Sequence, residues 1–426
     1  MQVIIHPSVI SGTLQAAASK SSMQRACAAA LLHEGKTIIS NPGRSNDDLA
    51  ALEIIQTLGA QIVSQTEEKI EILSSGVKPQ GRGINCGESG LSIRMFAPIA
   101  ALSGQQIVLQ GKGSLLNRPM HFFDEMFPEL GIEVQSNNGM LPITIKGPMQ
   151  AKNITIDGTL SSQYLTGLLF AFAKLVKHPV TITVKGLKSK PYIDLTLQVL
   201  RDFGYEVLHE NYKRFTILPA VPLNNRVIHY TVEGDWSGAA FLLVAGAIAG
   251  NLTITGLDTS STQADRSITK ALILANANIL IEENSISTAK AKLKAFQFDA
   301  TDCPDLFPPL VALAAFCEGV STIKGVSRLA YKESNRALTL KEEFGKLKVN
   351  IILEDDVMFI KGAVEVHGGM VHSNYDHRIA MACAIAALHA QGETIIEGAE
   401  AINKSYPDFY KHLKMIGANV SLPINN

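Results

Sequence analysis

The chain has 426 residues, of which 46% are hydrophobic and 18% charged, a balance that excludes extended disorder. Its formal net charge is −1, from 38 basic and 39 acidic side chains, which excludes bulk electrostatic binding to nucleic acid or anionic membranes. No apolar run is long enough to span a membrane, and the N-terminal segment does not resemble a secretory signal. The five cysteines are widely spaced without a zinc-ligand pattern, so we expect reduced thiols, no metal and a cytoplasmic location.

Two short signatures recur six times along the chain. The first is a Thr-, Ile- or Val-rich run bounded by Gly or Pro, which is typical of a strand. The second is a helix end followed by a strand, and it recurs at Gly59, Gly131, Gly204, Asn276, Lys348 and Gly417. Successive copies lie 72, 73, 72, 72 and 69 residues apart, which indicates six repeats that fill nearly the whole chain.

Each repeat is predicted to be a βαβαββ unit: a strand, an apolar helix, a strand, an amphipathic helix and two closing strands. The first helix is apolar on nearly all sides, as at 24–34, 91–103, 164–176 and 378–390, so we expect it to be buried. The sixth repeat lacks its last strand, and residues 1–8 are a spare strand that we expect to complete it.

The count of repeats predicts an α/β protein of two domains with three repeats each. One domain would be residues 16–234, with repeats 1–3, inserted into a discontinuous domain of residues 1–15 and 235–426. The chain would cross between the domains near 11–19 and 233–235, and we expect the active site in the interdomain cleft.

The apolar helices begin at polar sequences in every repeat. The polar residues at these starts are Lys20, Ser21, Arg25, Gly90, Arg94, Ser161, Ser162, Gln163, Asp235, Asp305, Asp376, His377 and Arg378. Ser and Asp here can be ordinary N-caps, and a lone histidine such as His377 is more often structural than catalytic. Lysine and arginine oppose the dipole of a helix start, however, so their presence indicates a bound anion or a carboxylate partner.

Charged loops also precede the second helices of successive repeats. They contribute Arg118, Ser189, Tyr192, Lys332, Glu333, Arg336 and Lys404. The cations of both sets suit one or two small ligands that carry several phosphates and carboxylates. Asp305 and Glu333 lie among these cations and are candidates for acid–base chemistry.

Ten motifs resemble those of the EPSP synthase (3-phosphoshikimate 1-carboxyvinyltransferase) family, in the family's order and across the whole chain. They are SKSSMQR, SGLSIR, NRPM, DGTLSSQYLTGLL, SKPYIDLTL, VEGDWS, CPD, YKESNR, YDHRIAM and KSYPDFY. The resemblance implies two inside-out α/β barrels, also called alpha-beta prisms, and a monomer without metal or organic cofactor. It implies transfer of the enolpyruvyl group of phosphoenolpyruvate to the 5-hydroxyl of shikimate 3-phosphate, with glyphosate competing at the donor site.

The resemblance also implies roles for individual residues. Shikimate 3-phosphate would be bound by Lys20, Ser21, Arg25, Ser161, Ser162, Gln163, Ser189, Tyr192, Asp305 and Lys332. Phosphoenolpyruvate would be bound by Lys20, Gly90, Arg118, Gln163, Arg336, Arg378 and Lys404, with Arg94, Asp235 and His377 as further candidates. Asp305 would be the base, and either Glu333 or Lys20 would donate a proton to the methylene carbon.

Some positions depart from the family pattern, and two other functions remain open. Glu88 and Met95 differ from the usual residues around Gly90, and Arg328, Ala330 and Asn335 differ around Glu333. We expect the Glu88 carboxylate to point away from the site or to pair with an arginine. The alternatives are a UDP-N-acetylglucosamine enolpyruvyl transferase, which would carry a cysteine in the segment 111–117, and a polyanion-binding module without catalysis.

Overall fold

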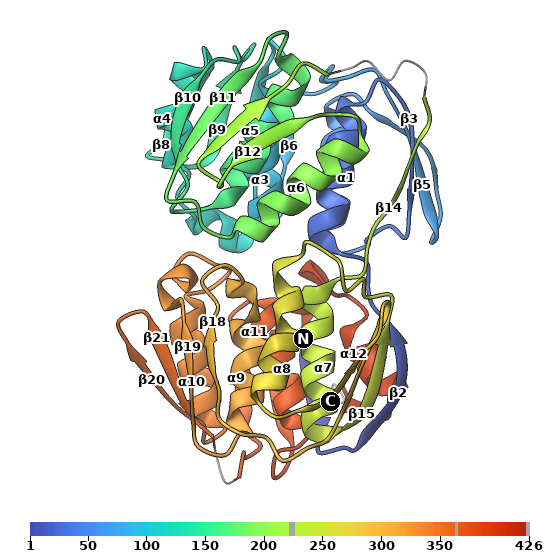
Figure 1. Ribbon diagram of the computed structural model, residues 1–426, viewed down its shortest axis with the longest axis vertical. Helices are drawn as coiled ribbons and strands as arrows, with labels where there is room; N and C mark the ends of the chain where they lie inside the picture. The colour runs from blue at the N-terminus through green and yellow to red at the C-terminus, as the bar shows by residue number, and fades with distance from the viewer. Residues whose placement is uncertain (221–225, 363–364, 423–426) are drawn as a thin grey trace. The chain divides into compact units, whose positions relative to one another are not determined.

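The computed structural model describes residues 1–220, 226–362 and 365–422, and the chain divides into two compact units (Figure 1). Unit 1 comprises Met1–Ala17 and Gly234–Asn426, and unit 2 comprises Ala18–Glu233. The chain therefore passes from one unit to the other twice, after Ala17 and after Glu233.

The described residues of unit 2 form three four-stranded sheets and six α-helices. The sheets, in spatial order, are β14 (Ile228–Thr231), β3 (Gly35–Ser40), β5 (Lys69–Ser74) and β4 (Gln61–Gln65); β6 (Gly83–Asn85), β7 (Gln106–Gln110), β9 (Met140–Lys146) and β8 (Glu133–Asn137); and β10 (Ile154–Asp157), β11 (Val180–Lys185), β13 (Arg214–Ile217) and β12 (Val207–Glu210). The helices are α1 (Lys20–Leu32), α2 (Asn46–Thr57), α3 (Gly90–Ala100), α4 (His121–Glu129), α5 (Ser162–Leu175) and α6 (Lys190–Asp202), with a 3-10 turn η1 (Gly113–Asn117).

Unit 1 repeats this plan. Its sheets are β2 (Ile10–Gln15), β15 (Gly250–Thr255), β17 (Ser285–Ala289) and β16 (Asn278–Ile281); β18 (Gln297–Asp299), β19 (Val320–Lys324), β21 (Val357–Lys361) and β20 (Asn350–Glu354); and β22 (Met370–His372), β23 (Thr394–Glu397), β1 (Gln2–His6) and β24 (Asn419–Ser421). Its helices are α7 (Trp236–Ala249), α8 (Ile268–Leu274), α9 (Phe307–Ala315), α10 (Arg336–Lys346), α11 (His377–Ala387) and α12 (Phe409–Met415), with 3-10 turns η2 (Ala264–Ser267), η3 (Pro304–Leu306), η4 (Val326–Leu329) and η5 (Ala399–Lys404).

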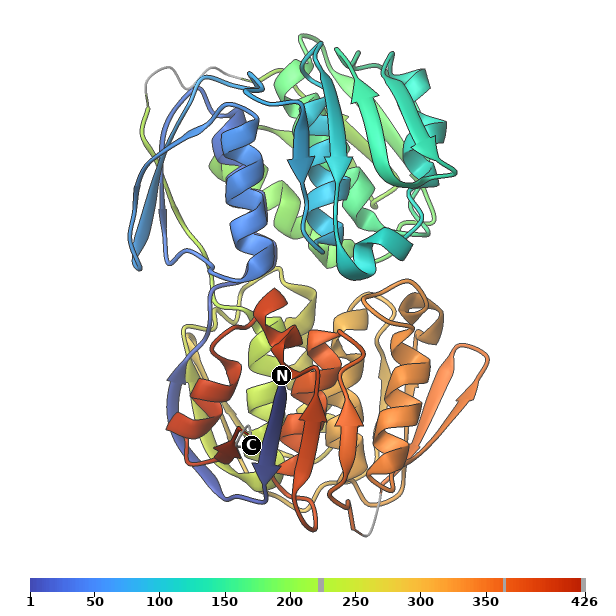
Figure 2. The ribbon, with the colours of Figure 1, turned by 180° about the vertical axis from the view of Figure 1, so that it is seen from behind.

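All six sheets share one topology, which confirms the predicted α/β fold of six repeats. In each sheet the entering strand pairs in parallel with the second strand, and the other two pairings are antiparallel. Strand β1 lies between β23 and β24, among the red and orange strands of its unit in Figure 2. The N-terminal strand therefore completes the sixth repeat, as the sequence predicts.

The two crossings separate each entering strand from the helix that follows it in the chain. Strand β2 precedes α1 in the sequence but pairs with β15 of unit 1, and β14 precedes α7 but pairs with β3 of unit 2. Each unit is therefore completed by strands that are distant in the sequence.

The second signature marks a left-handed turn at the end of each amphipathic helix. Its six residues have φ values of 114° at Gly59, 75° at Gly131, 81° at Gly204, 58° at Asn276, 66° at Lys348 and 96° at Gly417. Glycine and asparagine adopt this conformation most readily, which explains five of the six residues. Lys348 is the exception, since its Cβ makes the left-handed conformation costly.

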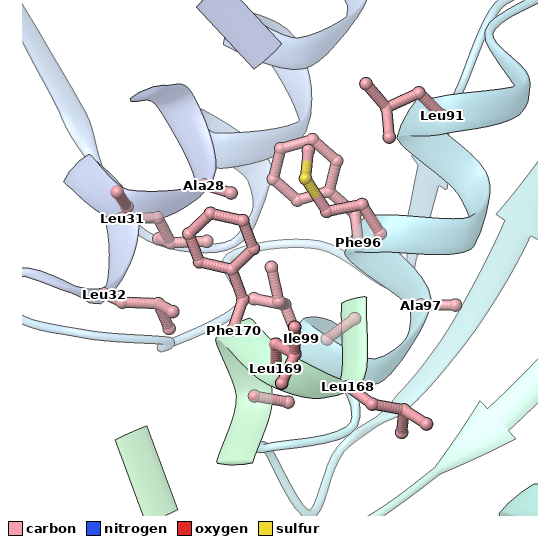
Figure 3. Close-up of a cluster of buried hydrophobic side chains, with 14 of the residues drawn as sticks. Ala28, Leu31, Leu32, Leu91, Phe96, Ala97, Ile99, Leu168, Leu169 and Phe170 are labelled. Atoms are coloured by element: carbon pink, nitrogen blue, oxygen red, sulfur yellow. The ribbon is translucent and has the colours of Figure 1, made fainter. Parts of the chain in front are cut away.

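The first helices of the repeats form the centre of each unit, inside the three sheets. In unit 2, side chains of α1, α3 and α5 point toward one another, including Leu31, Phe96 and Phe170 (Figure 3). These residues have no solvent exposure. In unit 1, α7, α9 and α11 pack together in the same way. This arrangement fixes the starts of three buried helices in each unit, and the predicted site residues lie at those starts.

Among the described residues, no helix combines the length and the hydrophobicity that a membrane crossing requires. The five cysteines are buried free thiols.

Candidate functional site

In unit 2, the start of α1 places Lys20 against a carboxylate of the next helix. The Ser19 hydroxyl caps α1 by accepting a hydrogen bond from the Ser22 amide. Lys20, the first residue of the helix, donates from Nζ to Oδ2 of Asp47 at 2.9 Å. Asp47 lies in the first turn of α2 and is only 3% exposed. Its carboxylate fixes the lysine and balances its charge.

Arg25 is almost completely buried and ties α1 to the start of α6. Its Nε donates to Oγ1 of Thr196 at 2.9 Å, and its two terminal nitrogens donate to the carbonyl oxygens of Ser21 and Tyr192. Burial lowers the pKa of Arg25 to about 10, against the opposing influence of Tyr192. These three acceptors are neutral groups, so the positive charge of Arg25 is available to a bound anion.

The start of α3 brings two further guanidinium groups together around Gly90. A Cβ at Gly90 would lie 2.5 Å from Nη1 of Arg118, 2.9 Å from Nη1 of Arg94 and 3.7 Å from Oε1 of Gln163. Arg94 donates to that same Gln163 oxygen at 2.8 Å and lies over the ring of Tyr164. Only a glycine permits this close approach of cations to the helix start.

The remaining predicted residues of unit 2 lie at the starts of α5 and α6. Ser161 caps α5 by accepting a hydrogen bond from the Gln163 amide, and Ser162 is the first residue of that helix. Ser189 immediately precedes α6 with φ of 55°, and Tyr192 lies in its first turn. The predicted residues of unit 2 therefore lie at the starts of α1, α3, α5 and α6, together with Arg118 after η1.

In unit 1, three cations converge on the carboxylate of Asp305. Oδ1 of Asp305 accepts from Nη1 of Arg336 at 2.8 Å and from Nζ of Lys332 at 3.2 Å. Its Oδ2 accepts from Nη2 of Arg378 at 3.2 Å. Burial alone would raise the pKa of Asp305, but Arg378, Lys332 and Arg336 outweigh burial and hold the pKa well below its usual range. The carboxylate is therefore ionised in this structure.

Arg336 is fully buried and contacts two more carboxylates. Its Nη2 donates to Glu333 at 2.6 Å, and its Nε donates to Oδ2 of Asp376 at 2.9 Å. Asp376 also caps α11 by accepting from the Arg378 amide at 3.0 Å. Burial disfavours the charge of Arg336, but Asp376, Glu333 and Asp305 together raise its pKa further above its usual value.

The other candidates of unit 1 also lie at helix starts or turns. Asp235 caps α7 by accepting from the amides of Ser237 and Gly238. His377 is the buried first residue of α11, and Lys404 is buried at the end of η5, which packs against α11. In the first turn of α7, the Ser237 hydroxyl donates a hydrogen bond to Asp265. Burial and the negative charge of Asp305 raise the pKa of Asp265 to about 7.

The sequence does not predict a role in the site for three of its carboxylates, Asp47, Asp265 and Asp376. The sequence marks Asp376 only as a helix start, and its bond to Arg336 joins residues forty positions apart. Asp47 follows the SN pair that begins α2 and resembles an ordinary capping residue. Gln24 was also missed, and its Oε1 accepts from the hydroxyls of Ser89 and Ser92 at the start of α3.

Three departures from the family pattern have a structural account. Asn335 still caps α10 by accepting from the Leu338 amide, and Met95 is fully buried in the core. The Glu88 carboxylate accepts hydrogen bonds from the amide and the hydroxyl of Ser114. Among the described residues, no group of His, Cys, Asp and Glu is arranged to hold a metal ion.

Each unit thus presents buried helix starts with several cations, an arrangement that defines a repeat α/β protein suited to small polyanionic ligands. Comparison with known proteins is more specific. The chain belongs to the EPSP synthase (3-phosphoshikimate 1-carboxyvinyltransferase) family, whose model matches residues 4–413.

Similar proteins cover nearly the whole chain. A 3-phosphoshikimate 1-carboxyvinyltransferase from Clostridium novyi is 35% identical over 422 residues, with 97% of each chain covered. One from Clostridium beijerinckii is 34% identical with the same coverage. The solved structure of EPSP synthase from Acinetobacter baumannii has a TM-score of 0.81 and 25% identity, and covers 99% of this chain and 100% of its own.

Proposed function

We propose that this protein transfers the enolpyruvyl group of phosphoenolpyruvate to the 5-hydroxyl of shikimate 3-phosphate and releases inorganic phosphate. The relatives that match almost the whole chain bear the name of this activity. The observation that carries the proposal is the convergence of Lys332, Arg336 and Arg378 on Asp305. A carboxylate among three cations provides both anion-binding groups and a proton acceptor at one place.

Shikimate 3-phosphate would be bound mainly by the starts of α1, α5 and α6. Arg25 offers a guanidinium that donates to a hydroxyl and two carbonyl oxygens, and Ser161, Ser162 and Ser189 offer hydroxyl and amide groups at helix starts. Ser21, Gln163, Tyr192 and Lys20 lie on the same helices. Asp305 and Lys332 of unit 1 would bind the same ligand near its reacting hydroxyl.

Phosphoenolpyruvate would be bound by the guanidinium groups around Gly90 and by Arg336, Arg378 and Lys404. Arg118 lies against the Gly90 backbone, so a small anion could contact both the arginine and the helix start. We propose that Arg94 holds Gln163 in place, since its Nη1 donates to the Gln163 side chain.

Asp305 is the proposed base for the 5-hydroxyl. In this structure its three cationic partners keep it ionised but also make it a weak proton acceptor. Substrate anions that take over Arg336, Arg378 and Lys332 would remove these partners and raise the pKa of Asp305. The hydroxyl oxygen can then attack C2 of phosphoenolpyruvate while its proton passes to the carboxylate.

The addition also requires a proton on the methylene carbon, from Glu333 or Lys20. Glu333 is bound to Arg336 at 2.6 Å, whereas Lys20 is bound to Asp47 at 2.9 Å. Loss of a proton from the resulting methyl group and loss of phosphate would then restore the double bond. The cations would stabilise the tetrahedral intermediate between these steps.

The test is phosphate release from phosphoenolpyruvate with shikimate 3-phosphate, compared with UDP-N-acetylglucosamine as the acceptor. Release with only the first acceptor supports the proposal, and release with only the second supports the sister activity. Asp305→Asn should lower kcat on the order of 10²–10⁴-fold. The matched control is Asp408→Asn, which changes an exposed carboxylate of the same unit.

Loss of the Asp305 charge should also affect stability, because three cations lose a shared partner. We expect Asp305→Asn to unfold at a lower temperature than the parent and to regain stability when shikimate 3-phosphate binds. An active, normally stable Asp305→Asn variant would remove Asp305 from the mechanism.

We further propose that the protein works as a monomer in the cytoplasm. The five cysteines are free thiols, as in reducing compartments. Size-exclusion chromatography with light scattering at assay concentrations tests the monomer.

A further inference from the structure

The segment before α3 and the turn before Arg118 contact each other at both ends. At the first end, the Lys112 amide donates to the Gly87 carbonyl oxygen at 2.7 Å. At the other end, the Arg118 guanidinium returns to Gly90, where a Cβ would lie 2.5 Å from its Nη1. Four residues, 87–90, therefore contact both the start and the end of the segment 112–118.

Glu88 joins the two segments between these ends. Its Oε2 accepts hydrogen bonds from the amide and from the hydroxyl of Ser114, both at 3.3 Å. Ser114 lies in the first turn of η1, where backbone amides lack a partner within the turn. The carboxylate thus supplies an acceptor that the turn cannot supply itself.

Gly113 shows how closely the turn is fitted to this carboxylate. Its φ is +56°, and a Cβ there would overlap the carboxyl group of Glu88. Both the left-handed backbone and the absence of a side chain allow the turn to approach Glu88. Lys112 is exposed, whereas Leu115 of the same turn is fully buried, so the bonds to Glu88 hold the turn together with one buried side chain.

We propose that Glu88 is a positioning residue for Arg118: it holds η1 against residues 87–90 and thereby sets the guanidinium against Gly90. The inference rests on the proposed function in one respect, since it gives Arg118 the task of binding the phosphoenolpyruvate anion. Arg118 follows η1 directly, and its amide donates to the Leu115 carbonyl oxygen within the turn. A shift of η1 therefore shifts Arg118.

The chemistry explains why a carboxylate can stand near an anion site. Its charge is directed at the Ser114 amide and hydroxyl, and a charged acceptor forms stronger bonds to these donors than a neutral one. Glu88→Gln keeps an acceptor oxygen at the same reach but loses the charge. Glu88→Ala removes the acceptor altogether.

The first test measures the turn itself and does not depend on activity. Hydrogen–deuterium exchange of a peptide that covers residues 111–118 should be faster in Glu88→Ala than in the parent, with Glu88→Gln between them. Glu125→Ala is the matched control, because Glu125 is an exposed carboxylate of α4 in the same unit. Unchanged exchange in a folded Glu88→Ala variant would overturn the proposal.

The second test separates the two substrates in the phosphate-release assay. Glu88→Ala should raise the KM for phosphoenolpyruvate about ten-fold, with the KM for shikimate 3-phosphate within about two-fold of the parent, as expected for one displaced arginine contact. Glu88→Gln should recover most of the loss. Equal increases in both KM values, or no rescue by glutamine, would show a merely structural role for Glu88 and contradict the proposal.

Two features keep these outcomes interpretable. If Glu88→Ala does not fold, Ser114→Ala removes one of the two hydrogen bonds from the other side and should shift the KM for phosphoenolpyruvate in the same direction. If the parent shows no phosphate release, the proposed function fails, whereas the exchange experiment still tests the contact between Glu88 and η1.

Discussion

Replacement of Gly90 by alanine tests whether the start of α3 is part of the donor site. The substitution adds one carbon at a helix start, where alanine is otherwise well tolerated, since Gly90 does not have a left-handed φ. Its effect should therefore come from the space that the methyl group takes. That space is next to Arg118 and Arg94, whose exposed fractions are 6% and 7%.

The geometry sets the size of the expected effect. The new Cβ would lie 2.5 Å from Nη1 of Arg118 and 2.9 Å from Nη1 of Arg94. Arg118 must therefore move by about 0.9 Å to regain ordinary van der Waals contact. A hydrogen bond to a charged group contributes roughly 1.5–3 kcal/mol. Loss of the bond between Arg118 and phosphoenolpyruvate should therefore raise the KM for phosphoenolpyruvate about ten- to one-hundred-fold. If glyphosate competes at this place, its inhibition should weaken as well.

The assay measures phosphate release while phosphoenolpyruvate is varied at saturating shikimate 3-phosphate. A second series varies shikimate 3-phosphate at saturating phosphoenolpyruvate. Gly345→Ala is the matched control, because a Cβ at this position of α10 would have no heavy atom within 4 Å. The control should leave both KM values unchanged. A folded Gly90→Ala variant with an unchanged KM for phosphoenolpyruvate would refute the reasoning, since Arg118 would then not need its present position.

Three other substitutions test the stability of the fold. Lys348→Gly should raise the free energy of unfolding by about 0.5–1 kcal/mol in urea denaturation, because Lys348 is an exposed non-glycine residue at φ of 66°. Asp376→Asn should lower that free energy by about 3 kcal/mol or more, well beyond the loss of a helix cap, because fully buried Arg336 loses a charged partner. Burial raises the pKa of Asp48 from 3.8 to about 7, so the folded state retains a proton that the unfolded state releases. The free energy of unfolding should therefore fall as the pH rises from about 4 to 7. Asp48→Asn should flatten this fall when thermal unfolding is measured as a function of pH.

The repeat could be predicted from the sequence because its signals are local. A left-handed turn favours glycine or asparagine, and five of the six copies carry one of these residues. The copy at Lys348 is still recognisable, because the spacing of the other copies fixes its position. The N-terminal strand β1 was placed by counting alone, since each repeat requires four strands.

The pairings within the site could not be predicted, because they join distant parts of the chain. Lys20 and Asp47 lie in consecutive helices, and only the packing of α1 on α2 brings them together. Glu88 illustrates the same limit. Its motif suggested a carboxylate that avoids the site or pairs with an arginine, whereas its bond to Ser114 depends on a turn that begins more than twenty residues later.

The carboxylates around Arg336 suggest why such a site can be buried before substrate binds. Arg336 is fully buried, and a buried charge without a partner would be strongly destabilising. Asp376 binds both Nε and Nη2 of Arg336 and also caps α11, whereas Asp305 and Glu333 bind only the outer nitrogens of the guanidinium. In the proposed reaction, substrate anions would compete with these outer carboxylates and leave the bond to Asp376 intact. When a substrate anion replaces Asp305 as a partner of Arg336, the Asp305 carboxylate would therefore become free to act as a base.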